Sequence, residues 1–75
     1  MKLHDFVKSF ASEFNEIPEG GFTPNTIYKD LAEWDSLAVL TIISMIDDEY
    51  EKTLTGADLR ACNTIEDLYN FIHSK

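Results

Sequence analysis

Apolar residues recur at helical spacing over the first part of the chain. They stand one or three positions apart with polar and charged residues between them, which is typical of a helix with one buried face: Leu3, Phe6, Val7, Phe10, Ala11, Phe14 and Ile17. The pattern predicts a helix from Leu3 to Glu16. Pro18 and the glycines that follow it would end this helix.

A second and more apolar stretch runs from Ser36 to Glu51 and predicts a central helix. Its apolar residues form two adjoining strips, more than a single neighbouring helix could cover: Leu37, Leu40 and Ile43 on the first, and Val39, Ile42, Ile46 and Tyr50 on the second, with Met45 beside them. We therefore expect this helix to contact several others and to leave part of its apolar surface exposed.

Residues 17–35 show no sustained periodicity, so a long loop separates these two helices. A loop of this length in so small a domain either packs on its own side chains or is functional. The side chains expected to hold it to the bundle are Phe22, Ile27, Leu31 and Trp34, with a single helical turn around Tyr28 to Ala32.

Two more helix starts are each marked by a threonine with an acidic residue three positions later, a pattern that caps helices. Thr55 with Asp58 opens a short segment that ends at Ala61, and Thr64 with Asp67 opens a last helix. The sequence contains no strand pattern. We therefore expect an all-α fold: a small four-helix bundle of three main helices and one short helix, with the long loop between the first two, in a single domain over residues 1–75.

The chain is strongly acidic, with 14 Asp and Glu against 6 Lys and Arg and a net charge of −8. Such a chain repels phosphate backbones and anionic membranes, so we expect no nucleic-acid or membrane binding, and partners with basic patches. The single Cys62 allows no internal disulfide, which fits a reducing compartment. No apolar run reaches the length of a membrane span and the first residues are no signal peptide, so we expect a cytoplasmic monomer.

Asp35 and Ser36 stand where the long loop meets the apolar helix. The N–H groups and the dipole at a helix start favour an anion, so a phosphate on the Ser36 oxygen would lie at a positive end. The alternative is that Asp35 or Ser36 simply caps the helix. From Asp30 to Glu51 there are seven acids and no Lys or Arg. These acids either attract basic partners or form a solvated charged face.

The central helix and the residues that open it resemble those of acyl carrier proteins. The segment Asp35-Ser36-Leu37, the apolar residues after it and the closing Asp47-Asp48-Glu49-Tyr50 match the family pattern without a gap. Chain length, acidity, helix order and the long first loop agree as well, so the resemblance covers essentially the whole chain.

The resemblance implies a role for each matching residue. Ser36 would be the attachment point of 4′-phosphopantetheine, transferred from coenzyme A by a phosphopantetheinyl transferase that reads Asp35 as part of its motif. The thiol of this arm would carry acyl or aminoacyl groups as thioesters between loading and acyl-transfer enzymes. The residues facing these partners would be Leu37, as an exposed apolar anchor, with Thr41, Asp47, Asp48 and Glu51. Side chains that could part around an acyl chain, or simply pack the core, are Ile42, Ile43, Ile46, Ile65 and Leu68.

The chain departs from the fatty-acid carriers close to the motif. Thr41 and Ser44 stand where those carriers commonly have Glu and Met, and Trp34 stands where a small residue is usual. We interpret Trp34 as a loop anchor. The differences favour a specialised carrier, in a polyketide, peptide or aminoacyl-transfer pathway, over bulk fatty-acid synthesis.

Ser36 also separates two rival functions. An enzyme with Ser36 as nucleophile lacks a Gly-x-Ser-x-Gly turn and a base near Ser36 in the sequence, so we expect no catalytic residues, and no metal site. An acidic interaction module that is not phosphopantetheinylated needs only the acidic face and the apolar helix, and stays open. Ser36→Ala should abolish carrier activity with the fold intact, but should change little in such a module.

Overall fold

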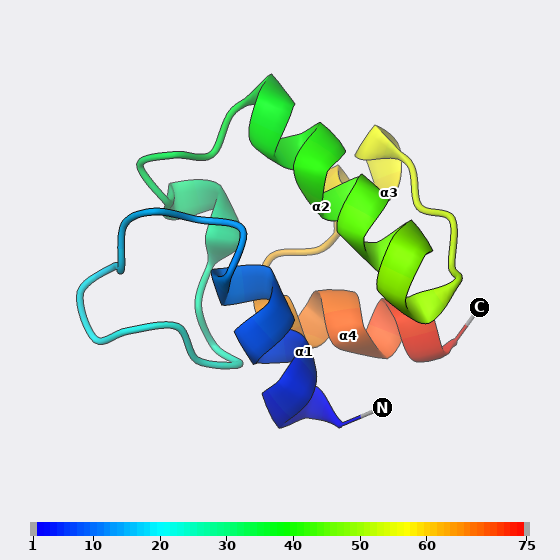
Figure 1. Ribbon diagram of the computed structural model, residues 1–75, viewed down its shortest axis with the longest axis horizontal. Coiled ribbons are helices and arrows are strands. Elements are labelled where there is room, and N and C mark those ends of the chain that lie inside the picture. The colour runs from blue at the N-terminus through cyan, green and yellow to red at the C-terminus, as the bar shows by residue number, and fades with distance from the viewer. Residues whose placement is uncertain (1, 75) are drawn as a thin grey trace.

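Four α-helices and one turn of 3-10 helix make up the regular structure of residues 2–74, which are the residues that this computed structural model describes (Figure 1). In chain order they are α1 (Leu3–Ala11), the 3-10 turn η1 (Tyr28–Asp30), α2 (Ser36–Tyr50), α3 (Gly56–Ala61) and α4 (Ile65–His73). The predicted all-α bundle with one short helix is confirmed. The single domain over residues 1–75 stays a prediction, and its end residues Met1 and Lys75 lie outside the described range.

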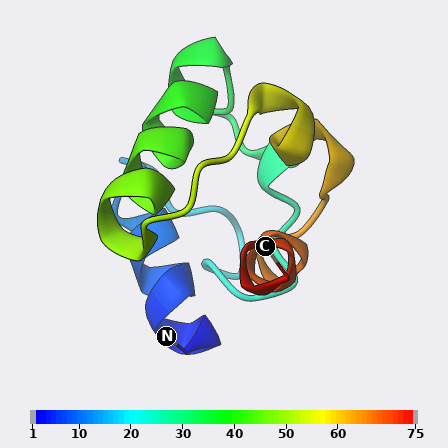
Figure 2. The same ribbon diagram turned by 90° about the vertical axis from the view of Figure 1, so that its right-hand side faces the viewer.

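Helix α1 packs against both α4 and α2, and α3 packs against α2. Figure 2 shows α2 on one side of the molecule and α3 and α4 on the other, with the connection after α2 crossing between them. The beginning of α2 lies at the end of the molecule away from the beginning of α1, beside the long loop (Figures 1 and 2). The loop and the start of α2 therefore form one region of the surface.

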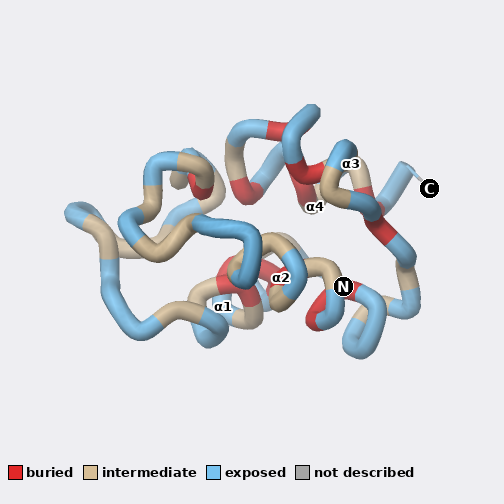
Figure 3. Tube along the Cα trace, turned by 90° about the horizontal axis from the view of Figure 1, so that it is seen from above, coloured by how far each residue is buried: buried red, intermediate tan, exposed pale blue. Residues whose placement is uncertain are grey.

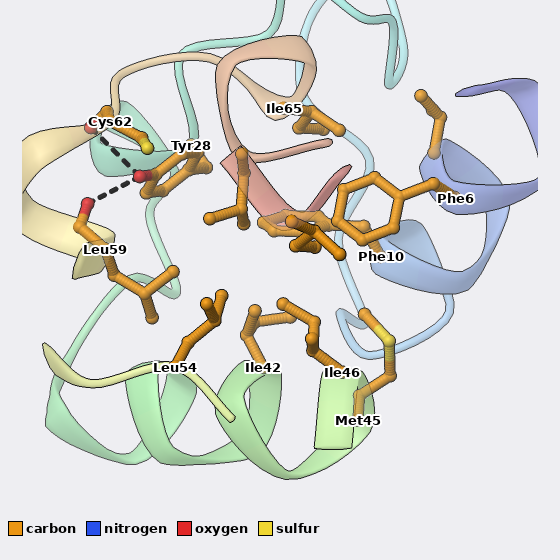
Figure 4. Packing of buried hydrophobic residues seen from close by; sticks show 13 residues of the cluster. Phe6, Phe10, Tyr28, Ile42, Met45, Ile46, Leu54, Leu59, Cys62 and Ile65 are labelled. Carbon is orange, nitrogen blue, oxygen red and sulfur yellow. Dashed lines mark hydrogen bonds between the residues drawn. The ribbon is translucent and has the colours of Figure 1, made fainter. Parts of the chain in front are cut away.

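The core is built from the inward faces of all four helices, the turn η1 and the connections next to α3. Its buried residues are all hydrophobic, and no buried charged residue occurs within residues 2–74: Phe6, Val7, Phe10, Tyr28, Ile42, Met45, Ile46, Leu54, Leu59, Cys62, Ile65, Leu68 and Ile72. Figure 4 shows Ile42 and Ile46 of α2 pointing into the same interior as Phe10 of α1. The long loop is mostly exposed or intermediate (Figure 3), and Tyr28 is the buried residue within 12–35.

Helix α1 is shorter than its sequence pattern predicts. It ends at Ala11 rather than at Glu16. The N–H groups of Asn15 and Glu16, which a longer helix would bond to carbonyls four residues earlier, instead donate to the carboxylate of Glu33 at 3.1 and 2.9 Å. The prediction was wrong because a residue from the far end of the loop supplies the acceptors.

The two apolar residues of the predicted stripe beyond Ala11, Phe14 and Ile17, differ in their burial. Phe14 still packs on Phe10, with the ring centres 5.4 Å apart, so its spacing correctly indicated a core contact. Ile17, which the stripe placed on the buried face, is 79 % exposed. A side chain six residues past the last helical residue no longer follows the helix face, since the chain has already turned away.

Tyr28 fastens the long loop to the end of α3. Its hydroxyl lies within hydrogen-bond distance of the backbone carbonyl oxygens of Leu59 and Cys62 (Figure 4). Carbonyls at the end of a helix lack helical partners, so the hydroxyl supplies a hydrogen-bond donor to α3 and at the same time holds the loop. Burial raises the pKa of the Tyr28 phenol, which keeps the group a neutral donor. The turn predicted around Tyr28 is present, as Tyr28–Asp30.

The loop also supplies acceptors at the start of α4. The carbonyls of Pro24 and Thr26 accept the N–H groups of Glu66 and Ile65 at 2.9 and 3.1 Å. Between them and η1, the side chain of Ile27 is 47 % exposed. The expectation that this side chain anchors the loop was therefore only partly right, because the backbone just before it makes these contacts.

Replacing Tyr28 with phenylalanine tests this anchor. Tyr28→Phe deletes the hydroxyl and leaves buried carbonyls without a donor, so we expect the free energy of unfolding to fall by about 1–3 kcal/mol in urea denaturation. Tyr50→Phe is the control, because its half-buried hydroxyl donates to Ser9 Oγ at a longer 3.3 Å and should contribute less than about 1 kcal/mol. Equal losses in the two variants would contradict the role assigned to Tyr28.

Candidate functional site

Two neighbouring residues at the start of α2, Asp35 and Ser36, differ in their contacts. Asp35 is the N-cap: its Oδ1 accepts the N–H of Ala38 at 2.8 Å, and its carbonyl accepts that of Val39 at 3.0 Å. Ser36 is the first helical residue and is exposed, and within residues 2–74 its hydroxyl has no hydrogen-bond partner. Capping, the alternative reading of this motif, is therefore carried out by Asp35 alone, and the Ser36 oxygen is left accessible.

Trp34 holds the chain immediately before this cap. Its ring stacks on Phe10 at an interplanar angle of 13° and on Phe14 at 27°, and it lies tilted by 56° against Tyr28 with the ring centres 4.8 Å apart. Aromatic contacts of this kind stabilise beyond their buried area. Trp34 is thus a loop anchor, as its sequence position suggested, and it joins the motif to the rings of α1.

One face of α2 is turned away from the core. Leu37 and Leu40 are 71 % and 61 % exposed although both are large and apolar. Residues three and four apart share a helix face, and the same spacing continues through Thr41 and Ser44 to the acids at the end of the helix. The Thr41 hydroxyl donates to the Leu37 carbonyl at 2.9 Å, so it is turned back onto its own helix.

An open groove of about 620 Å³ runs along this face. It is lined by apolar, hydroxyl and acidic side chains: Leu37, Leu40, Met45, Thr41, Ser44, Asp47, Asp48 and, from just beyond α1, Glu13. Four of the five predicted partner-facing residues meet here. Glu51 does not line the groove; it follows the last turn of α2, with its N–H bonded to the Asp47 carbonyl and a left-handed φ of 55°.

A smaller hollow of about 290 Å³ adjoins the groove on the side of the motif. Its lining comes from both ends of the long loop and from the first turns of α2: Glu13, Phe14, Asn15, Glu33, Asp35, Leu37, Ala38 and Thr41. Neither lining includes a Lys, Arg or His among the described residues. The surface next to Ser36 is therefore apolar at its centre and negative at its margins.

Three residues of this region were missed in the sequence. Glu13 and Glu33 reach it from helix and loop segments far apart in the chain, and no local pattern points to them. Leu40 was placed on the same strip as Leu37 but was not named as a partner-facing residue. Its spacing of three residues from Leu37 did indicate the exposed face of the helix, because the more apolar strip of Ile42 and Ile46 forms the opposite, buried face.

Nothing in this region is arranged for catalysis. Within residues 2–74 no group of His, Cys, Asp and Glu could hold a metal ion, and no base contacts the Ser36 hydroxyl.

Burial raises the pKa of the Cys62 thiol, which disfavours the reactive thiolate. No helix of the described range has the length and apolarity that crossing a membrane needs.

The side chains proposed to part around an acyl chain lie in the core. Ile42, Ile46, Ile65 and Leu68 have no exposed surface, and Ile43 is partly buried against them. Figure 4 shows three of them filling the interior between α1, α2 and α3. In this structure these side chains pack the core, which is the alternative role that the sequence allowed for them.

Comparison with known sequences shows the family of this chain. A sequence model of the phosphopantetheine attachment site matches residues 5–72, from the first turn of α1 to the last turn of α4. The chain belongs to the phosphopantetheine-binding carrier proteins. Members of this family carry covalently attached 4′-phosphopantetheine and are not themselves enzymes. A comparison with solved structures gave no significant match.

The residues of this carrier fit the prosthetic group. A phosphodiester needs an accessible hydroxyl, and Ser36 offers one with no competing partner in the described chain. The first turn of α2 also has N–H groups without helical acceptors, and Asp35 occupies only that of Ala38. An anion bound to Ser36 would therefore meet the positive end of the helix.

Substitutions at Asp35 and Ser36 should differ in their effect on stability, because only Asp35 caps the helix. Asp35→Ala removes the acceptor for the Ala38 N–H, and we expect the free energy of unfolding to fall by about 1 kcal/mol, whereas Asp35→Asn should retain most of the cap. Ser36→Ala should stay within about 0.5 kcal/mol of the wild type because its side chain has no partner. Urea denaturation measures all three, and a loss in Ser36→Ala as large as that in Asp35→Ala would contradict this division.

Proposed function

We propose that this carrier holds 4′-phosphopantetheine on the Oγ of Ser36 and carries acyl or aminoacyl groups between enzymes of a specialised pathway. The pathway classes in question are polyketide, peptide and aminoacyl transfer, rather than bulk fatty-acid synthesis. The observation that carries the site is the exposed Ser36 hydroxyl, without a partner, at the first residue of α2. When bound, the group supplies a terminal thiol that holds the cargo as a thioester.

The residues around Ser36 each support one part of this role. Asp35 completes the helix start without using the Ser36 oxygen, so the cap survives modification. The positive end of α2 favours the phosphodiester charge. A transferase that reads Asp35 and Ser36 together would find both exposed on the same turn.

The exposed face of α2 supports transient docking of partner enzymes. Leu37 and Leu40 offer an apolar contact that a partner can cover, and Asp47 and Asp48 flank it with negative charge. Glu51, just beyond the helix, would extend this acidic margin. Exposed charge pairs speed encounter, contribute little to the lifetime of a complex and weaken with salt, which suits a carrier that must leave each enzyme.

The composition of this face supports a specialised pathway. Thr41 and Ser44 are short and uncharged and stand between Leu37 and Asp48 in the groove. A partner selected by this carrier would meet fewer charges at the centre of α2 than at its end. We further infer that the carrier acts as a monomer in the cytoplasm, which its net charge of −8 and its single buried cysteine favour.

Intact-mass analysis tests the attachment site. Incubation with coenzyme A and several phosphopantetheinyl transferases should add one phosphopantetheinyl group, which peptide mapping should place on Ser36. Ser36→Ala should gain none, while Ser12→Ala, which removes another exposed serine outside the motif, should be modified like the wild type. No mass gain in the wild type would favour the unmodified interaction module, and modification elsewhere would overturn the site.

The acidic end of α2 should govern the KM of these transferases. Asp47→Asn with Asp48→Asn removes two exposed charges, so we expect KM to rise roughly two- to tenfold at low salt, with the difference shrinking at high ionic strength. Asp5→Asn with Glu66→Gln removes the same net charge from exposed positions on α1 and α4 and should leave KM unchanged. An equal rise in the control would show that net charge, and not this surface, is responsible.

A further inference from the structure

Glu33 links the end of α1 to the segment that leads into Ser36. One carboxylate oxygen, Oε2, accepts the N–H groups of both Asn15 and Glu16, at 3.1 and 2.9 Å. The other, Oε1, lies 3.3 Å from the Asn15 N–H and 3.4 Å from its side-chain amide. One side chain thus binds two consecutive peptide groups that lie 17 and 18 residues away.

This contact stands in place of the further turn that the sequence predicted beyond Ala11. The N–H groups of Asn15 and Glu16 would otherwise need helical or solvent acceptors, and hydrogen bonds from N–H groups to a carboxylate are stronger than those to neutral oxygens. The N–H groups of Glu13 and Phe14 still bond to carbonyls of α1, and the next two residues, Asn15 and Glu16, are fixed to Glu33 instead. Glu33 and Asn15 then form one wall of the hollow beside Ser36, with Glu13 and Phe14 next to them.

Three consecutive residues before Ser36 are each held by a different contact. Glu33 binds backbone N–H groups, Trp34 stacks on the rings of Phe10 and Phe14, and Asp35 caps α2. Ser36, the next residue, has a free hydroxyl in the described chain. Trp34 holds the rings of Phe10 and Phe14, whereas Glu33 holds the backbone of Asn15 and Glu16 that follows them.

We propose that Glu33 is a positioning residue for the modification of Ser36. It holds the end of α1 beside the motif, so that a transferase meets the Ser36 hydroxyl and its surroundings in one arrangement. A substrate segment whose surroundings are already ordered loses less freedom on reaching the transition state, so we expect this contact to act on kcat. The proposal rests on the function proposed above, in which Ser36 receives the prosthetic group.

Three substitutions of Glu33 test the contact. In Glu33→Ala we expect the amide hydrogens of Asn15 and Glu16 to exchange roughly tenfold faster, and kcat for phosphopantetheinylation to fall roughly tenfold, with KM within about twofold because the docking acids remain. Glu33→Gln should retain most of both, since a single oxygen accepts both N–H groups. Glu33→Asp keeps the charge but is one methylene shorter, so we expect the same faster exchange and lower kcat as in Glu33→Ala. This variant serves as the test if the alanine variant folds poorly.

Lys29→Ala provides the matched control. Lys29 is another charged side chain of the same loop, and its Nζ donates to the backbone carbonyl of Arg60 on the side of α3. Its removal should loosen the loop there and leave kcat and the exchange of Asn15 and Glu16 unchanged. Fluorescence of Trp34, the single tryptophan of the chain, reports in every variant whether the ring keeps its packing.

Each outcome decides the proposal. Faster exchange and lower kcat in Glu33→Ala and Glu33→Asp, with recovery in Glu33→Gln, support it. Wild-type kcat in Glu33→Asp, unchanged exchange at Asn15 and Glu16, or an equal loss of kcat in Lys29→Ala overturns it. A wild-type chain that no transferase modifies overturns the function proposed for Ser36 and the positioning role with it, and the exchange rates then still show whether Glu33 holds the end of α1.

Discussion

The hydrogen bonding of the buried Tyr28 hydroxyl is the interaction on which this fold depends. About a third of the chain lies between α1 and α2, and backbone without regular structure is costly to order. Tyr28 places one large ring of that loop in the core and directs its hydroxyl to the last carbonyls of α3. The loop thereby becomes part of the bundle, and the segment that follows it reaches α2 from a fixed point.

The two faces of α2 differ in burial. Ile42 and Ile46 fill the core, while Leu37 and Leu40 are left in solvent, where apolar side chains gain nothing for stability. Acids at the end of a helix also oppose its dipole. A surface that contributes so little to the folded state is better explained by what it binds, and an apolar centre with a negative margin suits partners with basic patches.

The sequence predicted what depends on neighbouring residues and missed what depends on distant ones. Both threonine caps are present with their predicted acids, and Asp35 and Ser36 stand at the helix start that periodicity assigned to them. The end of α1 could not be predicted, because the N–H groups of Asn15 and Glu16 beyond it bond to Glu33, whose position relative to them is set by the folded loop. Glu13 was missed for the same reason: it reaches the groove of α2 only after α1 and α2 have packed.

The site combines a rigid base with weakly held contacts, and a carrier requires both. The groups that surround the proposed attachment point, namely the Asp35 cap, the Trp34 ring and the Glu33 carboxylate, are each held by contacts within the fold. The groups that would meet partners, Leu37 and Asp47 among them, are exposed. Ordering the first set during folding means that a partner does not have to order it during binding, so little affinity is lost to entropy. Leaving the second set solvated keeps each complex short-lived, which allows one carrier to serve several enzymes in turn.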